Sequence, residues 1–335
     1  MIRTRRNPVA KAKAKTKSVE EIIAERKKEH GERAVIIDDN ELDFDHPRIS
    51  SGIIALDDIL GGGFAKGRMV DVYGENGSGK TGLALKFLGQ AQAHGKCVFV
   101  DLENAYDPNM ARLNGVDTRE LIVVQIETAE DVMSMIDDLV SSGEVAAIVV
   151  DSIAGMVPRA EMLGEVGDAH VGLVGRIISQ ALRITSKRYE SDTIVMFLNQ
   201  LRSNIGGFGN SPASTPTGGR AVKFYSSTRL KVARVEKIAG NGSEVLGQVV
   251  QVYSDKSRLS KPFQTARFEV LYDVGINNEG TLLDKALKAG LVKQGGAWFT
   301  DTETGQSIQG RLKFCEMLRE NRDVYDRLLT GVQKL

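Results

Sequence analysis

The segment most suggestive of chemistry is a glycine-rich stretch that reads Gly-Glu-Asn-Gly-Ser-Gly-Lys-Thr. Glycines let backbone N–H groups approach an anion closely, while a lysine can reach terminal phosphates and a threonine hydroxyl can bind Mg²⁺. An apolar run, Met69–Tyr73, precedes the stretch, and a helical pattern rich in alanine and leucine, Gly79–Ala93, follows it. The N-terminus of a helix also attracts anions, so this order predicts a nucleotide-phosphate site. The predicted cofactor-binding residues are Gly74, Glu75, Asn76, Gly77, Ser78, Gly79, Lys80 and Thr81.

Three polar residues follow apolar runs typical of buried strands: Glu103, Asp151 and Gln200. The carboxyl ends of parallel strands meet at one edge of a sheet, so we expect all three near the phosphates. Asp151 and Thr81 would bind Mg²⁺, Asp151 through water, and Glu103 would accept the proton of an attacking water. Gln200, a neutral amide, suits a sensor of the γ-phosphate. For Glu103, the alternative is an ordinary surface carboxylate at the start of a loop.

The elements that position these residues belong to a chain of 335 residues, 41% of them hydrophobic and 26% charged. This length predicts one large domain with one or two appendages. The longest apolar runs, such as Val145–Val150, are far shorter than the roughly 20 residues that cross a bilayer, so we expect no transmembrane helix. Two cysteines, Cys97 and Cys315, exclude a disulfide framework and a four-cysteine zinc site. They fit a reducing cytosol, and we expect a cytoplasmic protein.

From about residue 48 to residue 272, short β-branched runs alternate with longer helical patterns. Several runs are apolar throughout, as in parallel strands that are covered on both faces. The expected strands are Met69–Tyr73, Cys97–Leu102, Leu121–Ile126, Ala146–Asp151 and Thr193–Asn199. The expected helices are Gly79–Ala93, Ala129–Ser141 and His170–Tyr189. This alternation predicts an α/β fold with a doubly wound, mostly parallel sheet.

After Arg220 the strand patterns have no helices between them, and we expect antiparallel strands that extend the sheet. These strands are Arg229–Val235, Val245–Tyr253 and Ala266–Tyr272. Two helical patterns, Leu282–Ala289 and Arg311–Asn321, flank a turn or hairpin near Trp298 and indicate a small α+β C-terminal domain. The predicted domains are therefore an N-terminal element over residues 1–47, a core over 48–275 and the C-terminal domain over 276–335.

The N-terminal element is basic at its start, although the whole chain has 44 basic and 44 acidic residues. Residues 1–17 contain seven lysines and arginines and no acid, a helix is expected at Val19–Glu29, and five acids between Asp38 and Asp45 indicate a linker. The basic arm is either a solvated, disordered tail or a segment that helps to bind nucleic acid.

A long loop is expected between Arg202 and Arg220, where five glycines and two prolines accompany small polar residues. A loop of this length inside a compact domain is uncommon unless it is functional or disordered. Its position after Gln200 suggests a segment that orders when ATP binds, with Arg202 on a phosphate and Ile205 or Phe208 against bases. A second glycine-rich segment, Glu161–Gly172, leads into the helix that bears Arg176 and could line the same groove. A floppy surface loop is the alternative.

Several strings resemble the bacterial RecA family of homologous-recombination ATPases over about residues 48–280. Besides the phosphate motif they are Asp101–Pro108, Val150–Ser152, Gly164–Asp168, Asn199–Arg202, Thr217–Gly219 and Lys223–Tyr225. The resemblance implies a RecA-like P-loop NTPase core that uses ATP and Mg²⁺. It is also far more specific than the phosphate motif alone.

The resemblance implies a role for each matching residue. The implied catalytic residues are Lys80, Glu103, Gln200, Lys256 and Arg258. Lys256, Arg258 and Lys223 would reach the ATP of a neighbouring protomer, Phe224 would lie at that interface, and Asp107 would bind the nucleotide. The implied DNA-binding residues lie in or beside two loops, Glu161–Val171 and Arg202–Gly219. They are Arg176, Arg202, Ile205, Gly206, Phe208, Gly218 and Gly219.

One departure concerns adenine binding. Members of the family stack an aromatic residue on the adenine, and the matching position here is Met110, with Tyr106 as the nearby aromatic. Such divergence suits a family member encoded by a phage or mobile element.

The implied function is ATP-dependent homologous recombination and DNA repair, by filament formation on single-stranded DNA and strand exchange with homologous duplex DNA. The implied partners are these DNAs, further copies of the chain, loader or mediator proteins and a single-strand-binding protein. The alternatives are a RecA-fold DNA motor or repair ATPase without strand exchange, and a nucleotide-switched scaffold that does not act on DNA. The two cysteines cannot supply the zinc motif of the repair ATPases.

Overall fold

The computed structural model describes residues 17–30, 46–164, 172–188, 191–203, 214–216, 221–240, 242 and 244–334. The chain divides into two compact units, Met1–Asp45 and His46–Leu335. The first contains α1 (Val19–His30), which confirms the helix expected there. Ser18 and Glu21 form a capping box, since each accepts a hydrogen bond from the other's backbone N–H. The predicted basic arm lies almost entirely outside the described residues.

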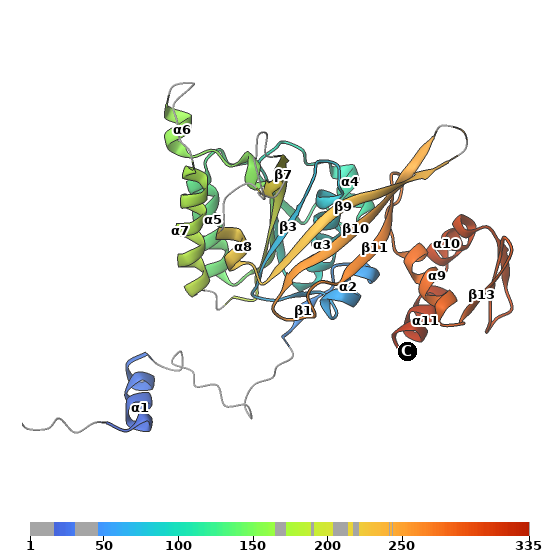
Figure 1. Ribbon diagram of the computed structural model, residues 1–335, viewed down its shortest axis with the longest axis horizontal. Helices are drawn as coiled ribbons and strands as arrows, with labels where there is room; N and C mark the ends of the chain where they lie inside the picture. Colours follow the sequence, from blue (N-terminus) through green and yellow to red (C-terminus); the bar gives the residue numbers. More distant parts are fainter. Residues whose placement is uncertain are drawn as a thin grey trace, which may run out of the picture. The chain divides into compact units, whose positions relative to one another are not determined.

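The second unit is built on a ten-stranded sheet, counted over the described residues (Figure 1). Its order is β12-β11-β10-β9-β3-β7-β6-β4-β5, and β8 pairs with β7. The strands are β3 (Met69–Gly74), β4 (Lys96–Asp101), β5 (Leu121–Val124), β6 (Val145–Asp151), β7 (Ile194–Ser203), β8 (Ser214–Pro216), β9 (Thr228–Ala239), β10 (Val245–Ser257), β11 (Thr265–Leu271) and β12 (Gly275–Asn277). The six strands from β9 to β5 pair in parallel, and β10, β11 and β12 extend them antiparallel. This arrangement confirms the predicted α/β class.

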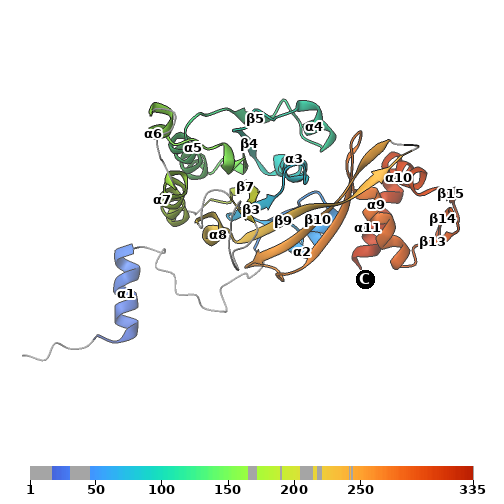
Figure 2. The same cartoon turned by 45° about the horizontal axis from the view of Figure 1, so that its top comes forward.

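Helices cover both faces of the sheet (Figure 2). On one face lie α2 (Ile54–Leu60), α3 (Lys80–Ala91) and α4 (Pro108–Leu113), which share one buried apolar cluster with the sheet. On the other face, α5 (Ala129–Ser142), α7 (Leu173–Arg188) and α8 (Ala221–Tyr225) share a second cluster. Burial of both faces explains the apolar run of β6 and the mostly apolar β3, which is interrupted by Asp71; both strands are buried at every position. A small antiparallel pair, β1 (Arg48–Ile49) and β2 (Phe64–Ala65), flanks α2.

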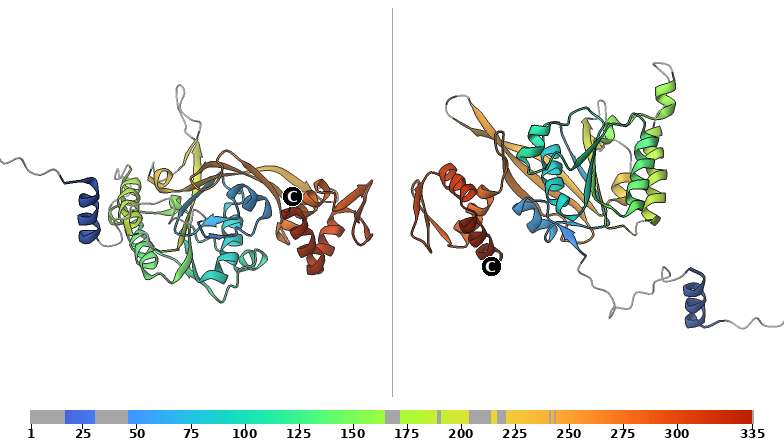
Figure 3. Two further views of the ribbon diagram at one scale, coloured as in Figure 1. Left: turned by 90° about the horizontal axis from the view of Figure 1, so that it is seen from below. Right: turned by 180° about the vertical axis from the view of Figure 1, so that it is seen from behind.

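Two strands are longer than their sequence patterns indicated. Strand β7 continues through Gln200 to Ser203, because its last residues pair with β8 instead of entering a loop directly. Strand β9 pairs with β3 only as far as Val232, and its remaining residues pair with β10 alone. The β9–β10 hairpin therefore extends past the sheet (Figure 3). In this hairpin, β9 and β10 pair with each other as far as Ala239 and Val245, although their sequences there do not alternate between apolar and polar residues.

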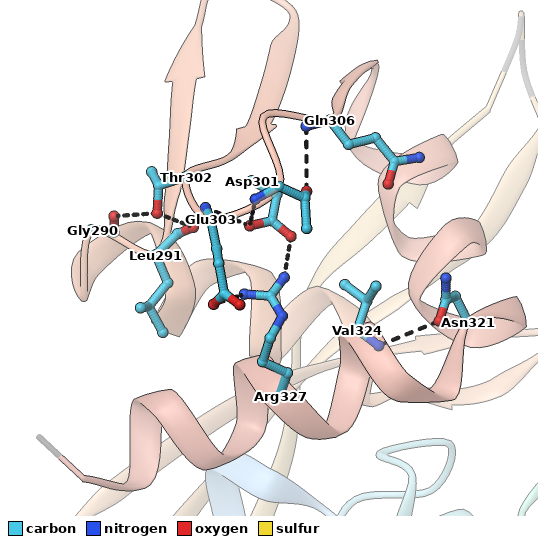
Figure 4. Close-up of polar contacts among 10 residues, drawn as sticks. Gly290, Leu291, Asp301, Thr302, Glu303, Gln306, Asn321, Val324 and Arg327 are labelled. Carbon is cyan, nitrogen blue, oxygen red and sulfur yellow. Dashed lines mark hydrogen bonds and ion pairs between the residues drawn. The ribbon is translucent and has the colours of Figure 1, made fainter.

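The C-terminal residues have an apolar core of their own, formed by α9 (Asn278–Lys288), α10 (Arg311–Glu320), α11 (Arg322–Gln333) and a three-stranded sheet. The strands are β13 (Val292–Gly295), β14 (Trp298–Asp301) and β15 (Ser307–Gln309), so the hairpin near Trp298 is confirmed. Buried Asp301 accepts hydrogen bonds from Arg327 and from the N–H of Glu303, and ties α11 to the sheet (Figure 4). The domain boundary at residue 276 stays a prediction.

Short elements complete the described chain: the one-turn helices Gln92–His94 and Ile153–Gly155, and α6 (Arg159–Leu163). Every helix of the described segments is too short or too polar to cross a bilayer.

Candidate functional site

The glycine-rich segment forms a tight loop between β3 and α3. Gly74, the last residue of β3, is in register with Gln200 on one side and Val232 on the other. A Cβ at Gly74 would lie 2.1 Å from the carbonyl oxygen of Val232, so only glycine fits there. Gly77 and Gly79 have φ angles of 69° and 99°, which are unfavourable for other residues. The sequence thus permits a backbone curled around the N-terminus of α3, which favours an anion.

Lys80 is folded back into this loop. Its Nζ donates hydrogen bonds to the carbonyl oxygens of Gly74, at 3.2 Å, and Glu75, at 2.9 Å. Burial lowers the pKa of Lys80, although the nearby carboxylates of Asp151 and Glu103 oppose this shift. The ammonium is therefore held by weak neutral acceptors, which a phosphate would outcompete as a partner for the charge.

Thr81 and Asp151, predicted from the sequence as Mg²⁺ ligands, are in direct contact. The Thr81 hydroxyl donates to Oδ2 of Asp151 at 2.8 Å. Burial raises the pKa of Asp151 to about 6, against the Thr81 hydrogen bond, which lowers it. Hydroxyl and carboxylate oxygens are ligands that Mg²⁺ accepts beside phosphate oxygens and waters. Ser78 adds a buried hydroxyl with no hydrogen-bond partner among the described residues. These donors fit a Mg²⁺–phosphate group.

Glu103 lies two residues beyond β4 and contacts the side chains of Ser152, just after β6, and of Gln200 on β7. Its Oε1 accepts a hydrogen bond from Nε2 of Gln200 at 2.6 Å and a second from the hydroxyl of Ser152. The structure therefore brings together both predicted residues at the expected edge of the sheet. Ser152 was not singled out from the sequence as a site residue. Its signal was its place immediately after Asp151, a strand-ending acid.

Asp107 has a local structural contact in addition to its predicted role. Its side chain accepts a hydrogen bond from the N–H of Asn109 and caps α4. Met110, on the same short helix, is 43% exposed. The ring of Tyr106 packs against Phe99 at a centroid distance of 5.5 Å, on the edge of the apolar core. Tyr106 is therefore engaged in packing, and Met110 has the more accessible side chain.

A contact between a distant turn and α4 escaped the sequence analysis. The turn between β11 and β12 packs on the C-terminus of α4, where a Cβ at Gly275 would lie 2.9 Å from the carbonyl oxygen of Leu113. This turn includes Tyr272, which is 54% exposed. No sequence motif placed this turn beside α4, since the contact of Gly275 with Leu113 arises from the antiparallel extension of the sheet.

Lys256 and Arg258 lie at the other end of the same strands. Ser257, between them, pairs with Thr228, which also pairs with Val70 near the start of β3. Gly74 is four residues further along β3, about 13 Å away at the usual rise of a strand. Lys256 and Arg258 are thus separated from the phosphate loop of their own chain by the length of β3.

These cations bind the C-terminal end of α8. Nζ of Lys256 donates to the carbonyl oxygens of Lys223, Phe224 and Ser226 at 2.9, 3.2 and 2.6 Å, and Arg258 donates to that of Phe224 at 3.3 Å. Burial lowers the pKa of Lys256, and repulsion by Arg258 adds to this effect. Lys223 and Phe224 are both exposed, Phe224 by 61%. A pocket of about 480 Å³ opens beside Phe224 and Arg258.

A buried ion cluster spans the strands between the two edges. Arg229 of β9 donates to Asp71 of β3 at 2.7 Å and to Asp255 of β10 at 2.6 Å. Its guanidinium also lies over the ring of Tyr73 at 4.3 Å. Arg229 and Asp71 are almost completely buried, and Asp255 is partly exposed. Sequence periodicity gave no sign of this cluster.

The predicted DNA-binding residues are only partly described. Arg176 is exposed in the first turn of α7. The backbone of Arg202 pairs with Thr215 across the β7–β8 ladder. The other predicted positions lie outside the described residues: Ile205, Gly206, Phe208, Gly218 and Gly219.

Comparison with known proteins places this geometry in a family. A family model described as the RecA N-terminal domain matches residues 17–277. The chain is 43% identical over 323 residues to Protein RecA of Acidothermus cellulolyticus, covering 96% of this chain and 93% of that protein. It is 44% identical over 315 residues to Protein RecA of Nocardia farcinica, covering 93% and 90%. The chain therefore belongs to the RecA family, and its function lies in recombination and repair.

Proposed function

We propose that the chain is a DNA-dependent ATPase that assembles into a helical filament on single-stranded DNA and exchanges strands with homologous duplex DNA. The observation that most supports this proposal is the division of the phosphate-binding groups between two edges of one sheet. Lys80, Thr81 and Asp151 lie at one edge, and Lys256 and Arg258 lie about 13 Å away at the other. ATP bound at the first edge of one copy would meet the cations of the next copy.

Hydrolysis uses groups of both copies. Lys80 and the loop amides bind the phosphates, and Mg²⁺ held at Thr81 and Asp151 would neutralise charge on the phosphate oxygens. Glu103 accepts the proton of the attacking water, as the bond from the γ-phosphorus to the leaving oxygen breaks. Lys256, Arg258 and Lys223 of the neighbouring copy stabilise the negative charge of the transferred group, and Asp107 binds the nucleoside side.

Nucleotide state is coupled to DNA through β7. Gln200 leaves Glu103 and donates to the γ-phosphate, and the strand that contains it continues directly into the β7–β8 ladder. Arg202 is part of this ladder, and in the sequence the glycine-rich segment follows it. We propose that Arg202 and Arg176 contact DNA phosphates while Ile205 and Phe208 contact bases. Binding to DNA should then weaken steeply with salt.

Further parts of the proposal are a cytoplasmic location, loader or mediator proteins, and a single-strand-binding protein that shares the DNA. The basic arm before α1 adds contacts to duplex DNA.

One set of measurements separates this function from its alternatives. ATP hydrolysis is measured with and without single-stranded DNA, and joint formation is then measured with matched and unmatched duplex. We expect stimulation by DNA and joints with the matched duplex only, and neither with Lys80→Ala. Stimulation without joints would indicate a DNA motor or repair ATPase. Hydrolysis indifferent to DNA would indicate a scaffold and contradict the proposal.

A further inference from the structure

We propose that Ser152 is a positioning residue for ATP hydrolysis, which fixes the carboxylate of Glu103 so that one oxygen is aimed at the attacking water. This inference rests on the proposed function of Glu103 as the base.

Ser152 is held rigidly at the carboxyl end of β6. Its side chain is 1% exposed, and its Oγ accepts a hydrogen bond from the N–H of Ala154 at 3.3 Å. The next residue of this turn, Gly155, packs directly on Leu102, where a Cβ would lie 2.8 Å from the carbonyl oxygen. The turn after β6 and the residue before Glu103 are therefore in contact. With Oγ already accepting from Ala154, the hydroxyl proton is directed at Glu103.

Glu103 receives both of its hydrogen bonds on the same oxygen. Ser152 and Gln200 both donate to Oε1, and within the described part of the chain no donor contacts Oε2. Two donors withdraw electron density from Oε1 and fix the plane of the carboxylate. Oε2, on an exposed side chain, remains the oxygen that can accept a proton from water.

The two donors differ in how firmly they are held. Gln200 lies on the strand that leads into the glycine-rich segment, and in the proposed cycle its amide moves to the γ-phosphate. Ser152 is buried in a turn that packs on the end of β4, and among the described residues Glu103 is the carboxylate to which it donates. Once Gln200 has moved, Ser152 is the group that keeps Glu103 oriented. Its hydroxyl proton stays on the serine throughout, and the proton of the water passes to Oε2 of Glu103.

The first test is the kinetics of Ser152→Ala in the full-length protein with saturating single-stranded DNA. Misplaced reacting groups cost about 10- to 100-fold in rate, so we expect kcat to fall by at least about tenfold. The KM for ATP and for Mg²⁺ should change less than about twofold, because the Ser152 hydroxyl donates to Glu103 and not to Thr81 or Asp151, the proposed Mg²⁺ ligands. Ser152→Cys, nearly the same size with a weaker donor, should be intermediate.

Ser51→Ala is the matched control. Ser51 is a buried serine whose Oγ accepts from the N–H of Ile53 at 3.2 Å, but it lies far along the chain from the carboxylates of the site. It should lose a similar amount of stability in thermal unfolding and keep its kcat. An equal fall in kcat for both serine variants would overturn the proposal.

The decisive test combines Ser152→Ala with Glu103→Ala. If Ser152 acts through Glu103, its removal from the Glu103→Ala protein should leave the residual hydrolysis unchanged. A further fall as large as in the wild-type background would overturn the proposal and place Ser152 with Asp151 or with the fold. If Glu103→Ala alone hydrolyses ATP at the wild-type rate, the proposed role of Glu103 is wrong, and that outcome is distinct from the failure of Ser152.

Discussion

The two edges of the central sheet, at opposite ends of its strands, differ in the partners of their charged groups. At the phosphate-loop edge, three charged groups have partners within the chain: Lys80 binds loop carbonyls, Asp151 binds Thr81 and Glu103 binds Gln200. At the opposite edge, Lys256 and Arg258 repel each other and, within the described residues, bind only backbone carbonyls rather than carboxylates. The first edge resembles a complete site, whereas the second has positive charge that calls for an anion from outside the chain.

The largest effect is expected at the complete edge. Lys80→Ala removes the ammonium that binds the terminal phosphates, and loss of one such group costs about 100- to 1,000-fold in kcat. Hydrolysis of ATP with single-stranded DNA should therefore fall by at least about 100-fold. Lys96→Ala, which removes an exposed lysine paired with Glu144, is the control and should keep full activity. Near-normal turnover in Lys80→Ala would remove the assignment of this edge.

Mixing variants tests whether the second edge completes the first across two copies. Glu103→Ala and Lys256→Ala should each hydrolyse ATP slowly. In an equal mixture, random assembly through a head-to-tail contact places an intact Glu103 beside an intact Lys256 in about a quarter of the sites. Turnover should therefore recover to about a quarter of the wild-type value. A mixture no faster than the mean of its components would show that both edges serve the same copy, and Arg258→Ala offers an independent partner variant.

The pH dependence of stability should report on the buried acid of the first edge, Asp151, when the wild type is compared with a variant that lacks this carboxyl group. Asp151 has a pKa of about 6 in the folded chain against 3.8 for the ordinary group, so the folded chain binds its proton more tightly. Its contribution to stability is greatest below about pH 4 and is lost as the pH rises through about 6. Asp151→Asn should reduce this loss by about 3 kcal/mol, measured by urea unfolding of the nucleotide-free protein.

Asp138→Asn, at an exposed position, is the control, and its free energy of unfolding should depend on pH as that of the wild type does. Parallel pH profiles for wild type and Asp151→Asn would contradict the effect of burial on Asp151.

The smallest effect concerns the nucleoside end of the first edge. Met110→Tyr places an aromatic ring on an exposed position of α4, and stacking contributes about 0.5–1.5 kcal/mol. Affinity for ATP, measured by titration with a non-hydrolysable analogue, should rise roughly 2- to 10-fold. Leu113→Tyr, at the 42% exposed end of the same helix, should change it little. Equal gains from both would show that the ring acts without contacting adenine.

The sequence predicted the parallel strands and the phosphate loop well because both depend on local signals. Buried runs such as Ile148–Val150 and the glycines of the loop have few alternative structures. The extension of β7 beyond Gln200 was not predicted, because its partner β8 lies in a glycine- and proline-rich segment. Helix α11 was not predicted either, although Tyr325 and Leu328 are buried in the C-terminal core and Val324, Leu329 and Val332 pack against it.

The site was less predictable where contacts join distant residues. Glu103 and Gln200 were placed at the correct edge by their positions after strands, but the hydroxyl of Ser152 that also donates to Glu103 has no motif of its own. The ion cluster of Arg229 likewise depends on the register of three strands, which the pattern of apolar residues does not specify. The roles of these residues in catalysis and DNA binding stay predictions.

The ion pairs of Arg229 with Asp71 and Asp255 fix the register of β3, β9 and β10 relative to one another. Sliding β3, β9 or β10 past one another would part buried opposite charges, a change that commonly costs 3–5 kcal/mol. The span from the phosphate loop to Lys256 is therefore constant in every copy. In a helical assembly of such copies, lengthening or shortening must come from rotation at the joints between them, and the axial rise per subunit would report the nucleotide held in each joint.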